Sequence, residues 1–273
     1  MEKLKKTTQP LSNHQERLNP FLEQILIFIY KFRYLSRPQI QKLMNHKHHH
    51  TIMLWLNYLV SNKYLRKYID SKYKIESAYF SLGTMARKYF LKTAEIQDIN
   101  YPKLDRVWKE NSYSESFKKH CMFLAHIYLS LLDLVKSVDE GKGKLHYFSN
   151  ADLEGVEHMI YPLPDAYFTI EDKDGAIERY FLDVFYDYTR WGDMEKRVKQ
   201  YLNYCNKQTW QLYMKHDFPK VILVCPKPIS KNNLEEYIQK MYKEKGKRVA
   251  FYLSTKEEIR YQGMNSRTLH EVK

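Results

Sequence analysis

Two aspartates, Asp165 and Asp183, have the residue type and the setting to do chemistry. Asp165 follows Pro164 and opens the apolar stretch "AYFTIED", while Asp183 lies in the middle of the next one, "RYFLDVFYD". If the two stretches are neighbouring strands of a hairpin, their carboxylates can converge on one hard divalent cation such as Mg²⁺, which prefers oxygen ligands and activates water for hydrolysis. Asp165 and Asp183 are therefore candidate metal ligands and candidate catalytic residues. The alternative is structural: Asp165 begins a strand and Asp183 makes a buried polar contact.

A hydrolytic centre of this kind also needs a cation that orients the nucleophile or offsets charge. The residue two positions after Asp183 is Phe185, which cannot supply one. The following stretch, "DMEKRVKQYLNYCNKQTW", predicts a helix, and a rotation of about 100° per residue defines its faces. The core stripe comprises Met194, Val198, Tyr201, Leu202 and Cys205. One flank carries Lys196, Arg197, Gln200 and Tyr204.

That flank supplies the candidate substitutes for the missing cation. Lys196 and Arg197 are the better candidates, and Gln200 with Tyr204 resembles the Q-x-x-x-Y helix motif of some exonuclease-like proteins. A Gln–Tyr pair at this spacing is often only a surface hydrogen bond. His120 and His126, on the apolar stretch "FKKHCMFLAHIYLSLLDLVKS", are expected to be satisfied core histidines. Tyr186, Tyr188 and Trp191 could stack on unpaired bases, although packing at the mouth of the sheet is the favoured interpretation.

The charge of the chain is concentrated in its first third. Of 45 Lys and Arg residues, 17 lie in positions 1–100 against 7 acidic residues, whereas the remainder has 28 against 25. The formal net charge of +13 favours a polyanionic partner. Double-stranded DNA is the expected partner, bound mainly through phosphate contacts.

The elements of that first third predict a winged helix-turn-helix. "NPFLEQILIFIYKF" has Asn19 as a cap and Pro20 at the first helical position, and "SRPQIQKLM" begins with a capping box of Ser36 and Gln39. "TIMLWLNYLVSNKYL" predicts a third helix, and "KYLRKYID" and "AYFSLG" predict two strands around a lysine-rich turn, the wing. The residues expected to contact DNA are Arg37, His48, His49, His50, Thr51, Lys63, Arg66, Lys67, Lys72 and Lys74. A basic solvated hairpin without a ligand is the alternative.

The remaining elements follow the order αβββαβ, with one more αβ unit. That order, "PDAYF" with Asp165 and "FLDVFYDYT" with Asp183 resemble the PD-(D/E)xK nuclease-like fold. With the winged helix in front, a histidine on the long helix and "KRVKQYL", residues 20–225 resemble the plasmid replication-relaxation family. This chain departs from the family pattern: it has Asp183-Val184-Phe185 in place of an E-V-D strand, and Arg197 with Tyr201 in place of a K-x-x-x-Y helix.

The resemblance implies a DNA-binding protein of a plasmid or mobile element, acting in replication or mobilisation beside other proteins of those processes, with a nuclease-like domain that need not be active. A Mg²⁺-dependent DNA endonuclease and a transcriptional regulator are the alternatives, and a homodimer stays open. The fold class is α+β. The predicted divisions are a basic segment 1–18, a winged helix 19–93, a linker 94–112, a nuclease-like domain 113–255 and a tail 256–273.

Localisation follows from what the sequence lacks. No apolar run is long and uncharged enough for a membrane span, and the first residues have no apolar core of a signal peptide. Cys121, Cys205 and Cys225 are far apart and show no paired spacing, so neither a zinc site nor a disulfide framework is indicated. A cytoplasmic protein that does not contact membranes is expected.

Overall fold

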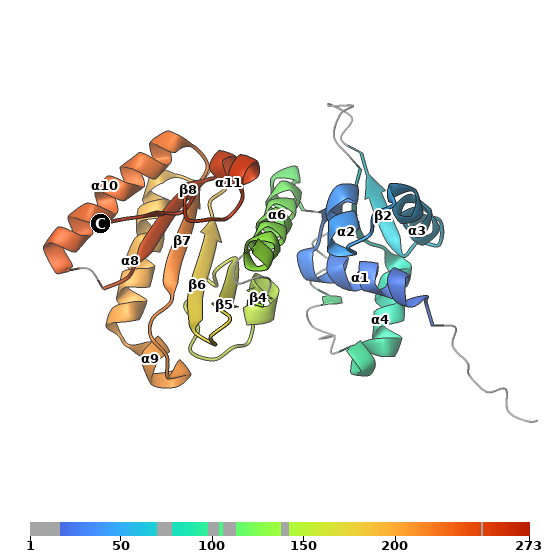
Figure 1. Ribbon diagram of the computed structural model, residues 1–273, viewed down its shortest axis with the longest axis horizontal. Helices are drawn as coiled ribbons and strands as arrows, with labels where there is room; N and C mark the ends of the chain where they lie inside the picture. Colours follow the sequence, from blue (N-terminus) through green and yellow to red (C-terminus); the bar gives the residue numbers. More distant parts are fainter. Residues whose placement is uncertain (1–16, 70–77, 98–103, 106–112, 138–141, 247) are drawn as a thin grey trace, which may run out of the picture.

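The computed structural model describes residues 17–69, 78–97, 104–105, 113–137, 142–246 and 248–273. It has a mixed α and β fold, with the N-terminal and C-terminal parts of the chain on either side of one long helix, α6 (Figure 1). We refer to residues 17–97 as the N-terminal unit and to residues 113–273 as the C-terminal unit. None of the described helices is long and apolar enough to cross a membrane.

The N-terminal unit combines helices with a small antiparallel sheet. Its elements are α1 (Pro20–Phe32), β1 (Leu35–Ser36), α2 (Arg37–Leu43), α3 (His49–Ser61), β2 (Leu65–Tyr68), β3 (Tyr79–Leu82) and α4 (Thr84–Gln97). The sheet has the order β1-β3-β2. Helix α1 begins as the sequence predicts, because the Asn19 side chain accepts a hydrogen bond from the backbone N–H of Phe21. The capping interaction of α2 is also present, with the Ser36 backbone N–H donating to Gln39 Oε1 at 2.9 Å.

The C-terminal unit is a six-stranded mixed sheet with helices on both faces. Its elements are α6 (Glu115–Ser137), β4 (Lys144–Ser149), α7 (Asn150–Leu153), β5 (Ala166–Glu171), β6 (Ile177–Val184), α8 (Trp191–Asn206), α9 (Thr209–Met214), β7 (Lys220–Cys225), α10 (Pro228–Lys245), β8 (Phe251–Thr255), α11 (Lys256–Gln262) and β9 (His270–Glu271). The strand order is β4-β5-β6-β7-β8-β9. Strands β4, β5 and β6 form an antiparallel meander, and β7 runs parallel to β6 after the α8 connection.

Alternation along the strands divides the buried side chains between the two faces. On β6, Phe181 belongs to the cluster that includes the buried residues of α8 and α10, whereas Leu182 and Val184 belong to the cluster that includes α6. Because successive strand residues point to opposite faces, Asp183 lies on the α8 face together with Phe181. The local pattern of β6 thus decides which helix the Asp183 carboxylate meets.

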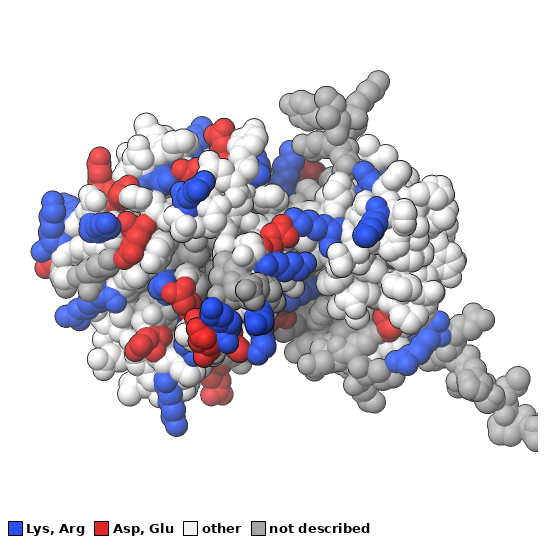
Figure 2. All heavy atoms as spheres, viewed as in Figure 1, with Lys and Arg blue, Asp and Glu red and all other residues white. Residues whose placement is uncertain are grey.

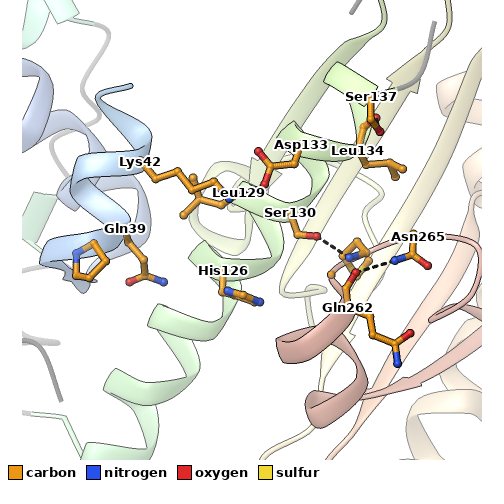
Figure 3. A pocket seen from close by; sticks show the side chains of 13 residues that line it. Gln39, Lys42, His126, Leu129, Ser130, Asp133, Leu134, Ser137, Gln262 and Asn265 are labelled. Carbon is orange, nitrogen blue, oxygen red and sulfur yellow. Dashed lines mark hydrogen bonds and ion pairs between the residues drawn. The ribbon is translucent and has the colours of Figure 1, made fainter. Parts of the chain in front are cut away.

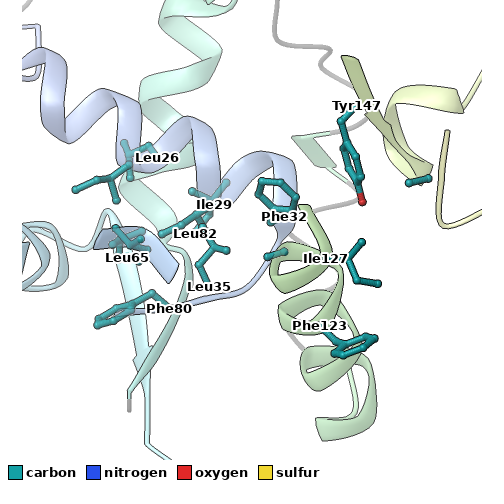
Figure 4. Close-up of a cluster of buried hydrophobic side chains, with 14 of the residues drawn as sticks. Leu26, Ile29, Phe32, Leu35, Leu65, Phe80, Leu82, Phe123, Ile127 and Tyr147 are labelled. Atoms are coloured by element: carbon teal, nitrogen blue, oxygen red, sulfur yellow. The ribbon is translucent and has the colours of Figure 1, made fainter. Parts of the chain in front are cut away.

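Helix α6 joins the two units. One cluster of buried apolar residues continues from α1 and the small sheet through α6 to the large sheet, as Figure 4 shows with Phe32, Ile127 and Tyr147. The ring of Phe32 lies 5.0 Å from that of Tyr128 on α6. In addition, Gln39 Nε2 on α2 donates a 2.6 Å hydrogen bond to the Met122 carbonyl oxygen on α6. The units therefore share a core.

Two predicted boundaries change. Helix α4 continues to Gln97, into the stretch predicted as a linker from 94 to 112, of which 98–103 and 106–112 lie outside the described residues. Residues 256–273 do not form a separate tail: they contain α11 and β9, and β9 pairs antiparallel with β8. Helix α11 is capped by Thr255, whose Oγ1 accepts from the Glu258 backbone N–H at 3.1 Å. Val272, fully buried, anchors this segment in the core of the sheet.

Candidate functional site

Asp183 is bound by side chains of α8. Arg197 donates from Nε to Asp183 Oδ2 at 2.7 Å and from Nη2 to Asp183 Oδ1 at 3.1 Å, and Tyr201 OH donates to Oδ2 at 2.6 Å. Arg197 and Tyr201 reach the same carboxylate because residues four apart share one face of a helix. The result is a buried bidentate ion pair with a third donor.

Arg197 also holds the segment before β5. Its Nη1 donates to the Pro162 carbonyl oxygen at 2.7 Å and to Gln200 Oε1 at 3.3 Å. Burial disfavours the charged guanidinium, but the negative charge of Asp183 outweighs it, so the pKa of Arg197 is raised. Burial raises the pKa of the Asp183 carboxyl against the opposing charge of Arg197. Burial also raises the pKa of the Tyr201 hydroxyl well above its ordinary value, so Tyr201 acts as a hydrogen-bond donor.

Asp165 has a different set of partners. Its Oδ1 lies 3.0 Å from His120 Nε2 on α6, and its Oδ2 accepts a 2.7 Å hydrogen bond from the Val184 backbone N–H. Burial opposes ionisation of this carboxyl, but the charge and hydrogen bond of His120 and the Val184 N–H together hold its pKa below the usual value. The two aspartates are neighbours at the start of β5 and the end of β6, yet they share no hydrogen-bond partner among the described residues.

His120 was expected to be a satisfied core or boundary histidine; it is buried, but only one of its ring nitrogens has a hydrogen-bond partner, and it belongs to the aspartate centre. Its ring stacks on Tyr186 with centroids 4.4 Å apart, and Tyr186 stacks in turn on the exposed Tyr188 at 5.2 Å. Its Nδ1 atom is buried without a hydrogen-bond partner. Helical periodicity could not identify this role, because α6 is apolar around most of its circumference. His126 fits its expectation, with Nε2 3.2 Å from the Ile259 carbonyl oxygen.

The other candidates on α8 lie apart from the carboxylates. Lys196 is exposed, and neither Asp165 nor Asp183 is among its partners. Gln200 contacts the centre only through Arg197. Tyr204 donates to the His158 carbonyl oxygen at 2.7 Å rather than to Gln200, so the two do not form the surface pair that their spacing allows. Of the flank predicted from the sequence, Arg197 is the residue that reaches the centre.

The centre does not fit a divalent cation. Each of the four carboxylate oxygens of Asp165 and Asp183 already has a protein partner, and the Arg197 guanidinium binds both oxygens of Asp183. Within the described part of the chain, no group of three or more His, Cys, Asp or Glu side chains is arranged to hold a metal ion. Phe185, at the position of the expected lysine, is buried in the α8 core. The positive charge beside Asp183 comes from Arg197.

The predicted DNA-contacting residues lie around α3. His49 and His50 are exposed on its first turn, with Thr51 partly exposed beside them and His48 immediately before the helix. Arg66 and Lys67 are exposed on β2, and Lys63 is exposed between α3 and β2. Arg37, partly exposed, begins α2. Lys72 and Lys74 lie outside the described residues.

The outward face of α3 is apolar rather than basic. Met53, Leu54 and Tyr58 are 39%, 55% and 48% exposed, and in Figure 2 the end of the molecule formed by α3 is largely free of charged side chains. The cations instead flank this face: Lys47 precedes α3 and Lys63 follows it. Lys42, on α2, is engaged elsewhere through a 2.5 Å ion pair with Asp133 of α6.

That ion pair crosses a groove of about 560 Å³ between the two units (Figure 3). Helices α2 and α6 and the segment after α11 line it, and Ser130 Oγ accepts from the Met264 backbone N–H at 2.5 Å on its floor. His126 lies in the wall, with Nε2 directed to the Ile259 carbonyl oxygen. The polar groups that the groove offers are thus largely engaged with the protein itself.

Comparison with known proteins adds no assignment. No family model matches the chain, and no curated protein matches it.

Proposed function

We propose that this chain is a DNA-binding protein whose N-terminal unit is a winged helix and whose C-terminal unit is a nuclease-like domain without a working metal centre. The observation that carries DNA binding is the distribution of cations around α3. Lys47 and Lys63 lie at its two ends, and Arg66 and Lys67 lie on the adjacent strand, all exposed. Such an arrangement brings positive charge beside both phosphate strands when the helix enters a major groove.

The topology of the N-terminal unit supports the winged helix. Three helices precede a β2–β3 hairpin, and the short strand β1 between α1 and α2 completes the sheet in the order β1-β3-β2. The side chains that α3 presents outward are suited to base edges more than to phosphates: Thr51 and the histidines can hydrogen-bond, and Met53 and Leu54 can contact thymine methyl groups. In this proposal affinity comes from the flanking cations and sequence preference from α3.

The second part of the proposal rests on the aspartate centre. The C-terminal unit supports a nuclease-like fold through its αβββαβ order, in which a parallel strand follows α8. Asp165 lies immediately before β5 and Asp183 lies within β6. Arg197 occupies both oxygens of Asp183, so the carboxylate that would bind metal instead anchors α8 and the segment before β5. We assign this centre a structural role.

The biological setting follows the resemblance to the plasmid replication-relaxation family: replication or mobilisation of a plasmid or related element, beside proteins of those processes. A Mg²⁺-dependent endonuclease using Asp165 and Asp183 is the second candidate, favoured only by the two carboxylates being neighbours. A transcriptional regulator is the third, and footprints at promoters rather than at a replication origin would favour it.

DNA binding is tested by a salt titration. Fluorescence anisotropy with a labelled duplex would measure affinity from 50 to 200 mM NaCl (about a fourfold span) for the native protein and for a Lys63→Gln/Arg66→Gln/Lys67→Gln variant. Each phosphate contact contributes about 0.9 to the steepness of the slope of log K against log salt concentration. If all three residues contact phosphates, the slope for the triple variant should be shallower by about 2.7. The control removes three charges elsewhere, with Lys196→Gln, Lys240→Gln and Lys243→Gln. Equal slopes for the two triple variants would reject the proposal.

The inactive centre is tested separately. The purified protein is incubated with supercoiled, linear and single-stranded DNA in Mg²⁺ or Mn²⁺, alongside Asp183→Asn. No cleavage above the Asp183→Asn background is expected. Cleavage by the native protein that disappears in Asp183→Asn, under conditions in which circular dichroism shows the variant folded, would establish the endonuclease instead and leave the DNA-binding result untouched.

A further inference from the structure

Three aromatic residues lie between the end of β6 and the first turn of α8. Residues 186–193 read "YDYTRWGD" and include Tyr186, Tyr188 and Trp191 but no Leu, Ile, Val or Met. The packing expected for these rings holds for Tyr186, which is partly buried. It does not hold for Tyr188 and Trp191, which are 67% and 40% exposed. Packing against the sheet therefore does not account for the two outer rings.

Tyr188 is the outer member of a row of three stacked rings. The ring of His120, buried on α6, lies 4.4 Å from that of Tyr186 at an interplanar angle of 14°. The ring of Tyr186 lies 5.2 Å from that of Tyr188 at an angle of 26°. The inner end of the row is fixed, because His120 Nε2 lies 3.0 Å from Asp165 Oδ1. Since Tyr186 covers one side of the Tyr188 ring, the large exposure of Tyr188 means that its other side faces solvent.

This row of rings meets the same end of α6 as the β2–β3 hairpin. On the hairpin, Tyr68 and Tyr79 stack with centroids 5.1 Å apart. Lys118 Nζ on α6 lies 4.7 Å from the centre of the Tyr68 ring, and the Tyr79 hydroxyl donates to Glu115 at 2.9 Å. Lys118 and His120 point to nearly opposite sides of α6, because two residues rotate by about 200°. The hairpin and the row are therefore separated by the width of one helix, about 10 to 12 Å.

Charge supplies little attraction at the surface of this row. Residues 186–199 contain four Lys or Arg side chains and three carboxylates. Of these, Arg197 is paired with the buried Asp183, and Asp187 pairs with Lys256 at 2.7 Å. A ligand would therefore be held by stacking on the exposed ring more than by its negative charge. Nucleobases suit such a site, because every base has a flat π face that can stack on a tyrosine ring.

We propose that the outer side of the Tyr188 ring stacks on an unpaired DNA base. This inference rests on the proposed function, because the base belongs to a strand that leaves a duplex bound by α3 and the β2–β3 hairpin. Residues 186–193 offer flat rings without aliphatic neighbours, which suits a planar base better than an apolar protein surface. The duplex contacts keep the unpaired strand close to Tyr188, so that one stacked base suffices to hold it. The protein then binds a junction of duplex and single strand more tightly than duplex alone.

The test compares a blunt duplex with the same duplex carrying a single-stranded extension. Fluorescence anisotropy measures the affinity of the full chain for the blunt form and for forms with an extension of about eight nucleotides on the 5′ or the 3′ end. We expect at least one extended form to bind about tenfold more tightly, the usual effect of one base stacked on an aromatic side chain. This gain should persist at both ends of the salt range used for the duplex, because stacking releases no counterions. Extended forms that bind no better than the blunt duplex would overturn the proposal.

Substitutions assign the gain to Tyr188. Tyr188→Leu keeps an apolar side chain but removes the flat ring, so it should abolish the gain and leave the affinity for blunt duplex and the Tm nearly unchanged. Tyr188→Trp should retain the gain. Tyr213→Leu is the matched control, because Tyr213 is also exposed and stacks on His158 at 3.5 Å, but lies on α9, beyond the opposite end of α8. A gain that survives Tyr188→Leu, or equal losses in Tyr188→Leu and Tyr213→Leu, would overturn the assignment.

A fluorescent base reports the stack directly and separates this inference from the proposed function. The fluorescence of 2-aminopurine in the extension should be quenched by the native protein and not by Tyr188→Leu. The Lys63→Gln/Arg66→Gln/Lys67→Gln variant should weaken the binding of blunt and extended duplexes alike and leave the gain from the extension intact. Salt-dependent duplex binding without any gain would reject the Tyr188 site alone. An RNA extension that gives a larger gain than the DNA extension would overturn the assignment to DNA.

Discussion

Arg197 binds both carboxylate oxygens of Asp183, at 2.7 and 3.1 Å, inside the layer between α8 and the sheet. Both residues are more than nine-tenths buried, so neither can exchange its partner for water. This pair places a buried cation against one of the two carboxylates that the sequence predicted as metal ligands. The contribution of the pair to stability can be measured.

Removing one member of this pair should lower the free energy of unfolding. Arg197→Met leaves Asp183 buried without its cation, and we expect a loss of about 3 to 5 kcal/mol in the free energy of unfolding, measured by urea denaturation. Arg197→Met combined with Asp183→Leu should recover part of that loss, because no buried charge remains. Lys196→Met, on the exposed flank of the same helix, should change stability by less than about 0.5 kcal/mol. Similar losses for Lys196→Met and Arg197→Met would contradict the role assigned to the pair.

The sequence could identify Arg197 but not its partner. The helical rotation of α8 places Arg197 beside the core stripe, which marks it as a cation close to buried residues. The carboxylate that Arg197 meets depends on which residues of β6 face α8 and on how β6 pairs with β5 and β7. The sequence of α8 contains neither piece of information. The position of His120 on a largely apolar helix correctly predicted that it is buried. Its contact with Asp165 arises only because α6 packs against the opposite face of the sheet.

The apolar periodicity of α1 was sufficient to predict its bounds. In residues 256–273, by contrast, no apolar pattern predicted the helix and the strand that form there. Strand β9 has two residues, too few for an alternating pattern, and the preceding α11 has seven. Their place in the structure is decided by tertiary pairing with β8. Likewise, the sequence analysis placed His48 to Thr51 at the start of the third helix but did not predict the apolar side chains, Met53 and Leu54, that this helix exposes.

Stability should depend on the ionisation of Asp165. Because its folded-state pKa is below the ordinary value of 3.8, the ionised carboxylate stabilises the fold above that pH, and this contribution is lost as the pH falls through the folded pKa. Asp165→Asn should therefore be less stable than the native protein at about pH 6, and the difference should shrink below pH 3.8. Urea denaturation across this range measures it. Asp193→Asn, at an exposed position, reports the general effect of removing one negative charge. A difference that grows towards acid pH would contradict the prediction.

Val272, which follows the last strand β9, should contribute to the core. Val272 is fully buried, and its backbone N–H donates to the Phe251 carbonyl oxygen at 2.9 Å. Val272→Ala removes two buried carbon atoms and leaves a cavity, so we expect a loss of about 2 kcal/mol in the free energy of unfolding. Arg267→Ala, exposed in the same segment, should be close to neutral. If both substitutions were neutral, residues 256–273 would behave as the separate tail that the sequence suggested.

Substitution of Gly83, at the junction of β3 and α4, should lower the stability of the protein. A Cβ atom built on Gly83 would lie 2.3 Å from the Lys63 carbonyl oxygen, and that carbonyl is fixed because it accepts a 3.0 Å hydrogen bond from the Met85 backbone N–H. The clash is with backbone, so relief requires a shift of the turn that carries Lys63. Gly83→Ala should therefore cost about 1 to 3 kcal/mol, measured by urea denaturation.

Gly192, near the start of α8, provides a matched control, since nothing lies within 4 Å of the position that an added methyl group would take. Gly192→Ala should be neutral or stabilising by up to about 1 kcal/mol, because alanine loses less backbone entropy in a helix. If Lys63 contacts DNA, Gly83→Ala should in addition weaken duplex binding under conditions in which the variant remains folded, and Gly192→Ala should not. Equal stability of the two variants would show that the Lys63 turn yields easily, and the close approach of Gly83 to it would then have no structural importance.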